Sequence, residues 1–107
     1  MSLLDVLKQQ YADTDSQVVD VDGIGTVHFK PLTIGQARQI DEESGAYDRI
    51  ARHFQVRAKD EEGRPLIKPG EFDEFKSYAD AEAVTSAVLK MQQLDNDETL
   101  EQAEKKS

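Results

Sequence analysis

A polar connection that contains two prolines, residues 60–75, constrains the fold of this chain more than any other segment. Its opening Asp-Glu-Glu-Gly is typical of a turn, and Pro65 and Pro69 prevent one helix from running through the segment. Leu66 and Ile67 are too apolar for a fully solvated loop. We therefore expect a partly buried turn that leads into a new helix. It divides the chain into two apolar-patterned halves that must fold against each other.

The composition limits the classes of function. A length of 107 residues suits one domain with a single core. The 22 acidic and 13 basic side chains give a net charge of -9, which disfavours binding to a nucleic-acid backbone. The absence of Cys excludes disulfides, thiolate catalysis and Cys-based zinc sites, and it fits a reducing compartment. Because we see neither a secretory signal nor 18 consecutive apolar residues, we expect a cytoplasmic protein without a membrane segment.

The first 16 residues predict a short amphipathic helix followed by an acidic linker. Leu3, Leu4 and Leu7 recur at roughly helical spacing, and Ser2 is a suitable N-cap. This helix could pack on the chain's own core or on another molecule. We favour the first arrangement, and the sequence leaves the second open.

The next segment predicts a β-hairpin. Val19 and Val21 alternate with polar neighbours, residues 22–25 supply turn residues, and residues 26–29 resume a β-type pattern. A hairpin alone is only marginally stable in water. We therefore expect it to lie on the helices that follow.

Two helices are predicted between the hairpin and the central connection. Thr33 is a good N-cap for a helix over residues 34–44, and Gly45 is expected as the residue that ends it. A second helix begins at Ala46. The pattern of residues 54–59 fits both a helix and a strand, so the sequence does not decide between them.

After the connection, the sequence predicts a short helix and then a long one. Phe72, Phe75 and Tyr78 lie three residues apart. The long helix carries the strongest periodic signal of the chain. Its apolar stripe consists of Val84, Ala87, Val88, Met91 and Leu94.

These elements predict an α+β, predominantly helical fold in which one N-terminal hairpin packs on four to five helices. We divide the chain into an N-terminal helix with its acidic linker (residues 1–16), a single globular α+β domain (17–94) and an acidic tail (95–107). For the tail we expect a frayed helix.

The search for catalytic or metal-binding patterns finds none. His28 and His53 are the only histidines, and neither has metal-ligand spacing. Calcium-loop templates that start at Asp20 or Asp95 fail at their fifth and twelfth positions. The sequence also lacks a phosphate-binding loop and a nucleophile with a matching base. We therefore expect a protein that is not an enzyme and that needs no metal or cofactor.

Several short motifs carry a resemblance to a known family. They are V-H-F-K-P-L-T (27–33), I-G-Q-A-R-Q-I (34–40), D-E-E-G-R-P-L (60–66) and L-K-M-Q-Q-L (89–94). In this order, and over about residues 18–94, they resemble the tail assembly chaperones of long-tailed bacteriophages. These small proteins are encoded just upstream of the tape measure protein.

The resemblance implies a protein of the host cell cytoplasm that coats the aggregation-prone tape measure protein during tail tube assembly and is absent from the mature virion. It also implies a frameshifted longer form that recruits the tail tube protein. Lys105 and Lys106 fit such a form because two lysine codons can be part of a slippery heptamer. The codons would test this point.

Two groups of residues are candidates for the contacts of such a chaperone. The first, for the client, consists of apolar side chains on two helices, although the stripe on the long helix is more typical of a core. The second, for self-association into a homo-oligomer, is a basic segment that a solvated helix face would also explain. The client candidates are Leu3, Leu4, Leu7, Val84, Val88, Met91 and Leu94; those for self-association are Arg49, Arg52, Arg57 and Lys59.

Two other functions compete with this interpretation. One is a structural virion component such as a tail terminator or head-tail connector, which would remain in finished particles. The other is an acidic inhibitor that mimics nucleic acid on a host protein. The Arg-rich segment argues against the uniformly acidic surface that such a mimic needs.

Overall fold

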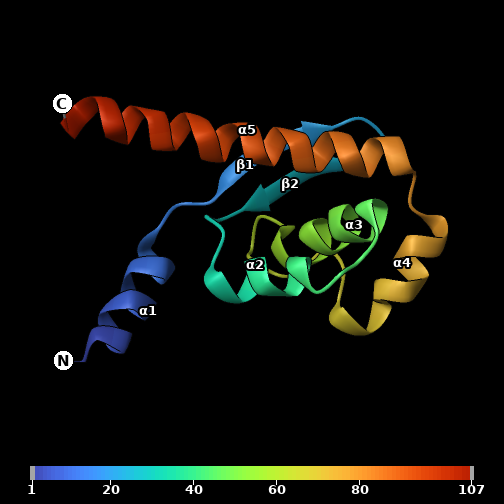
Figure 1. Ribbon diagram of the computed structural model, residues 1–107, viewed down its shortest axis with the longest axis horizontal. Coiled ribbons are helices and arrows are strands. Elements are labelled where there is room, and N and C mark those ends of the chain that lie inside the picture. The colour runs from blue at the N-terminus through green and yellow to red at the C-terminus, as the bar shows by residue number, and fades with distance from the viewer. Residues whose placement is uncertain (1, 107) are drawn as a thin grey trace.

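A computed structural model describes the backbone of residues 2–106 and the side chains of residues 2–96. The described residues contain five helices, one short 3-10 helix and one β-hairpin. The fold is α+β and predominantly helical, as the sequence predicted (Figure 1). The elements are α1 (Leu3–Asp13), β1 (Gln17–Val21), β2 (Gly25–Phe29), α2 (Ile34–Asp41), α3 (Ala46–Arg57), η1 (Pro69–Glu71), α4 (Phe72–Tyr78) and α5 (Ala81–Lys106).

The predicted hairpin is present, and its alternation is confirmed. β1 and β2 are antiparallel, with Val19 opposite Val27. Val19 and Val21 are buried, whereas Val18 between them is exposed. Gly23, in the turn, has a φ of 85°, a conformation that side chains other than glycine rarely adopt.

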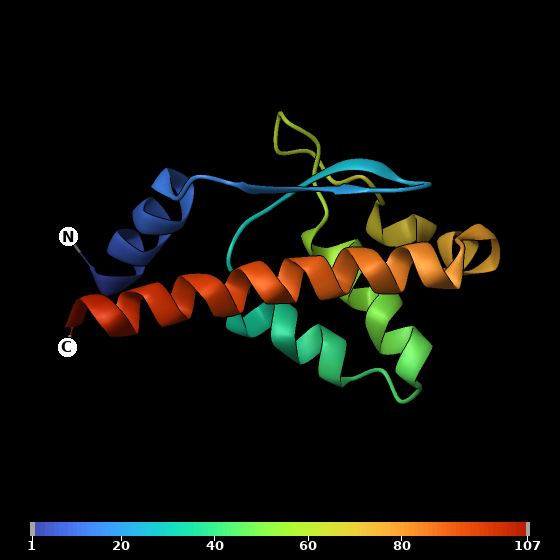
Figure 2. The same cartoon turned by 90° about the horizontal axis from the view of Figure 1, so that it is seen from above.

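The core lies between the hairpin, α3 and α5. α5 runs beside the hairpin and α3 (Figure 2). This arrangement covers the hairpin's apolar face, which explains why the hairpin is stable here. The buried cluster consists of Val19, Val21, Val27, Phe29, Phe54, Ala58, Val84, Ala87, Val88 and Met91.

The central connection forms the expected turn. The Asp60 carboxylate accepts hydrogen bonds from the backbone N–H groups of Glu62 and Arg64, at 2.9 Å each, and Gly63 has a φ of 85°. Ile67 packs against the core, so the connection is partly buried as predicted. Pro69 begins η1, which leads into α4.

The structure resolves the ambiguity at residues 54–59. α3 continues to Arg57, and Ala58 is its extended C-cap. The next residue, Lys59, then pairs with His28 in β2 through backbone N···O distances of 2.8 and 3.0 Å. The segment is therefore helical in its first part and extended in its last two residues.

The expected role of Gly45 was wrong. α2 ends at Asp41 with Glu42 as its C-cap, and Gly45 is instead the N-cap of α3, with a φ of -93°. A Cβ at this position would lie 2.9 Å from a carboxylate oxygen of Asp48. Glycine thus gives the Asp48 carboxylate room beside the N-terminus of α3, where negative charge is favourable.

The tail at residues 95–107 is helical in its backbone as far as Lys106. Leu100 and the other side chains beyond residue 96 lie outside the described part of the chain. Within the described residues, each helix is either too short or too polar to span a membrane.

Candidate partner-binding surfaces

The apolar face of α1 is uncovered in the single chain. None of the residues of α1 is buried, and the exposed fractions of Leu3, Leu4 and Leu7 are 72%, 59% and 51%. Tyr11 continues the same face and is also exposed. The sequence left open whether this helix packs on the chain's own core or on another molecule. In the structure, α1 lies away from the core. These leucines can therefore be contacted by another molecule.

Lys30 attaches the C-terminal end of α1 to the rest of the chain. Its ammonium donates to the backbone carbonyls of Tyr11 at 2.9 Å and Ala12 at 3.4 Å, and lies 4.9 Å from the centre of the Tyr11 ring. A cation at a helix C-terminus is favourable because it meets unpaired carbonyls. Sequence reasoning missed this contact, since it joins residues 18 or 19 positions apart.

The apolar stripe of α5 belongs to the core. Val84, Val88 and Met91 are buried, and Met91 has no exposed surface. Leu94 is partly buried against the same cluster. Their inclusion among the client-binding candidates is therefore corrected, because the hairpin and α3 already cover this stripe. The alternative interpretation, that the stripe is core, is the one that the structure shows.

The basic segment is largely engaged within the chain. Arg49 pairs with Asp41 at 3.0 Å, and Arg52 pairs with Glu43 at 2.9 Å. The Arg52 guanidinium also lies 3.7 Å from the centre of the Phe72 ring. These internal contacts reduce the basic charge available to an acidic patch on a second copy.

Arg57 and Lys59 are less accessible to a partner than fully exposed basic side chains. Arg57 is buried, so its assignment to a self-association surface was wrong. Lys59 is half-buried, and its backbone pairs with that of His28. The basic segment therefore does not form a continuous exposed surface.

The buried guanidinium of Arg57 joins three elements. Its Nη1 and Nη2 donate to the two carboxylate oxygens of Asp95 on α5 at 2.8 and 3.0 Å. Nη2 also donates to the backbone carbonyl of Lys30 at 2.7 Å, and Nη1 lies 3.0 Å from Nε2 of His53. Such a bidentate pair fixes the relative positions of α3 and α5. The carbonyl contact adds the segment that follows β2.

His53 is held in its neutral form by this environment. Burial, followed by the nearby charge of Arg57, lowers its pKa from 6.5 to about 4, and Asp95 opposes this shift. Its Nε2 faces an arginine donor and so must accept the hydrogen bond. The role of His53 in the described structure is therefore that of a buried acceptor.

The pKa of His53 predicts a pH dependence of stability. The unfolded state binds the proton near pH 6.5, whereas the folded state binds it only near pH 4. The stability that neutral His53 contributes is therefore complete above pH 6.5 and is lost as the pH falls towards 4. Between pH 7 and 5 the loss should be about 2 kcal/mol. Urea unfolding at both pH values measures it. His53→Gln should remove this part of the pH dependence and His28→Gln should retain it; equal pH dependence in all three proteins would contradict the assignment.

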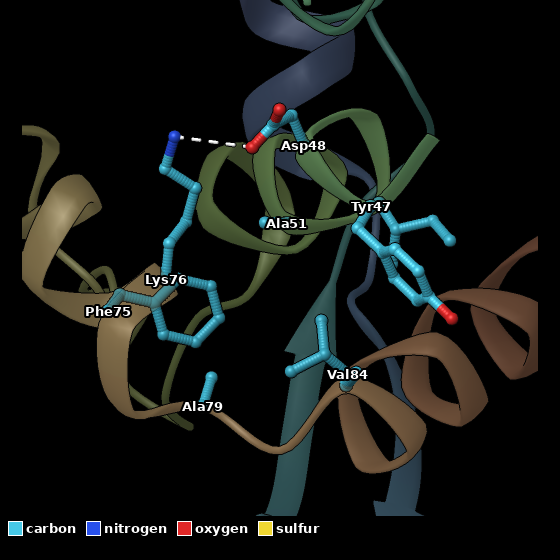
Figure 3. Close-up of a pocket in the computed structure, with 9 residues that line it drawn as sticks. Tyr47, Asp48, Ala51, Phe75, Lys76, Ala79 and Val84 are labelled. Atoms are coloured by element: carbon cyan, nitrogen blue, oxygen red, sulfur yellow. Dashed lines mark hydrogen bonds and ion pairs between the residues drawn. The ribbon is translucent and has the colours of Figure 1, made fainter. Parts of the chain in front are cut away.

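A small cavity of about 140 Å³ lies between α3, α4 and the start of α5. Figure 3 shows Phe75, Ala79 and Val84 around it, with Lys76 reaching towards Asp48. The Lys76 ammonium lies 3.3 Å from the Asp48 carboxylate. The lining of this cavity is mainly apolar. In the described part of the chain, no group of three His, Cys, Asp or Glu side chains is placed to hold a metal ion. Phe75, Ala79 and Val84 thus lie where α4, the segment after it and α5 come together.

The described surfaces thus include the uncovered amphipathic face of α1, whereas ionic contacts hold α3 to the segment after α2 and to α5. Comparisons with known protein families, with curated proteins and with solved structures find no match.

Proposed function

We propose that this protein is a non-catalytic binding protein that holds an apolar helix of a client through the uncovered face of α1. The observation that carries the proposal is the exposure of Leu3, Leu4 and Leu7 on one face of a formed helix. An amphipathic helix binds by placing such a face against apolar side chains of its partner. The net charge of -9 keeps a protein with this exposed face soluble.

The resemblance to tail assembly chaperones identifies the client that we propose. It is the tape measure protein of a long-tailed bacteriophage, kept soluble in the host cytoplasm until tail tube subunits assemble around it. A frameshifted longer form would bring in the tail tube protein. Buried Val84, Val88 and Met91 leave α1 as the apolar helix face on which this proposal relies.

The double variant Leu4→Ala/Leu7→Ala tests the proposal. Both side chains are exposed and Ala favours helix, so the fold should persist. Each lost contact with a client is worth about 1.5–3 kcal/mol if it is fully buried in the complex. We expect the amount of soluble tape measure protein that co-purifies to fall about tenfold or more. The measurement is co-expression with the tape measure protein from the same genome, followed by quantitative affinity purification.

The matched control is Gln9→Ala/Asp13→Ala, which truncates two exposed side chains on the polar side of the same helix. It should leave co-purification unchanged. Equal yields from both double variants would contradict the role of α1. Mass spectrometry of purified virions separates the main alternative, because abundant protein in finished particles would favour a structural virion component.

A further inference from the structure

An apolar groove lies at the end of the molecule opposite α1. Its walls are the hairpin tip, the central connection, α4 and the start of α5. The hairpin tip, α4 and the start of α5 lie at the end away from α1 in both views (Figures 1 and 2). The volume of the groove is about 540 Å³, and a shallower extension between the connection and α4 adds about 310 Å³. The two parts share Leu66, Ile67, Phe75 and Tyr78.

The floor of this groove is apolar and anchored in the core. Ile24, Ile67 and Phe75 are partly buried against the core cluster, and the Phe75 ring stacks on Phe54 with 5.6 Å between ring centres. Tyr78, by contrast, stands at the edge with 85% of its surface exposed. A preformed floor with a projecting aromatic side chain is typical of a binding groove.

The ionised side chains that line the groove are all acidic. They are Glu71, Glu74 and Asp80, and none of the lining residues is Lys or Arg. Asp80 accepts from the backbone N–H of Ala83 at 2.9 Å, and Glu71 accepts from that of Lys68 at 3.0 Å. Both carboxylates thus support the local backbone structure. Glu74 is exposed on α4.

We propose that this groove binds a basic amphipathic helix of a different protein. The apolar face of that helix would enter the groove, and its flanking Lys or Arg side chains would face Glu71 and Glu74. Opposite charge at the rim of an apolar contact raises the association rate and fixes orientation. A helix fits better than an added strand, because the hairpin contributes its tip and not an unpaired strand edge to the groove.

Among the side chains that the structure describes, neither α3 nor α1 of a second copy supplies such a helix. Arg49 and Arg52 pair with acids of their own chain, and Arg57 is buried. α1 has an apolar face but only one basic side chain, Lys8, against two acids. Two chains of charge -9 also repel each other. The occupant is therefore a partner with the opposite charge. This inference does not depend on the function proposed for α1.

The test uses the full chain and a synthetic helical peptide of about 18 residues, or five turns, with Leu on one face and Lys on the other. A peptide of the same pattern with Glu in place of Lys is the control of opposite charge. We expect the Leu/Lys peptide to bind and to shift the amide NMR signals of residues 66–67 and 74–78. Glu74→Lys and Tyr78→Ala should each weaken the binding reported by these signals about tenfold, and the Leu/Glu peptide should leave these signals unchanged.

Two control variants make the result specific. Glu61→Lys makes the same charge change in the exposed turn and should alter affinity less than twofold. Leu4→Ala/Leu7→Ala should also leave the peptide affinity unchanged, which separates this groove from the α1 surface. Equal losses for Glu61→Lys and Glu74→Lys, or signal shifts spread over the acidic surface, would overturn the proposal. Self-association that Glu74→Lys abolishes would also overturn it, in favour of a second copy.

Discussion

The Asp95→Asn variant is expected to lower the free energy of unfolding by about 3–5 kcal/mol. Asp95 supplies the carboxylate that faces the Arg57 guanidinium through two hydrogen bonds, and the Arg57 side chain has no exposed surface. An asparagine keeps the shape but removes the negative charge, so a buried cation is left without its counter-charge. Removing one partner of a buried pair costs more than removing both.

Chemical denaturation followed by circular dichroism measures this effect. The matched control is Asp41→Asn, which breaks the exposed pair with Arg49 and should cost less than about 1 kcal/mol. The double variant Arg57→Met/Asp95→Leu should be more stable than Asp95→Asn, since no buried charge remains. If Asp95→Asn costs no more than Asp41→Asn, the pair does not hold α3 against α5.

The Phe54→Ala variant should lower the free energy of unfolding by a similar amount, about 3–5 kcal/mol. Phe54 is almost completely buried, and its ring stacks on that of Phe75. It contributes to the cluster in which α3, α5 and the hairpin meet. Truncation removes the transfer free energy of the ring and leaves a cavity that the surrounding helices can fill only in part.

The same denaturation experiment on Tyr47→Ala provides the comparison. Tyr47 lies on the same helix, but 71% of its surface is exposed, so its truncation should change stability by less than about 0.5 kcal/mol. Equal effects of the two truncations would mean that α3 does not pack through Phe54. A large effect of Phe54→Ala alone would support the core described here.

The central connection and the hairpin could be predicted because their signals are local. The prolines, the glycine and Asp60 favour a turn through constraints on neighbouring backbone angles. Likewise, alternation at Val19 and Val21 assigns one face of a strand to the interior. The one local error, at Gly45, arose because glycine is common both before and after helices, and the end of α2 at Asp41 and the φ of -93° at Gly45 distinguish the two.

The contacts of Arg57 could not be predicted in the same way. Its partners are Asp95, 38 residues later, and the backbone carbonyl of Lys30, 27 residues earlier. In sequence it was one member of a basic segment, with the same apparent role as Arg49. Burial separates the two, and burial is a property of how α3 lies against α5 and β2.

The sequence by itself determined that apolar helical stripes lie near residue 4 and on α5, because helical periodicity can be recognised from the spacing of apolar residues. Only the tertiary structure decided which stripe is covered. The hairpin and α3 bury Val88 and Met91, whereas α1 is held through Lys30 at its polar C-terminal end and keeps Leu4 exposed. The apolar residues of α1 and α5 have the same helical spacing. Whether such a stripe becomes core or surface depends on which elements pack against it.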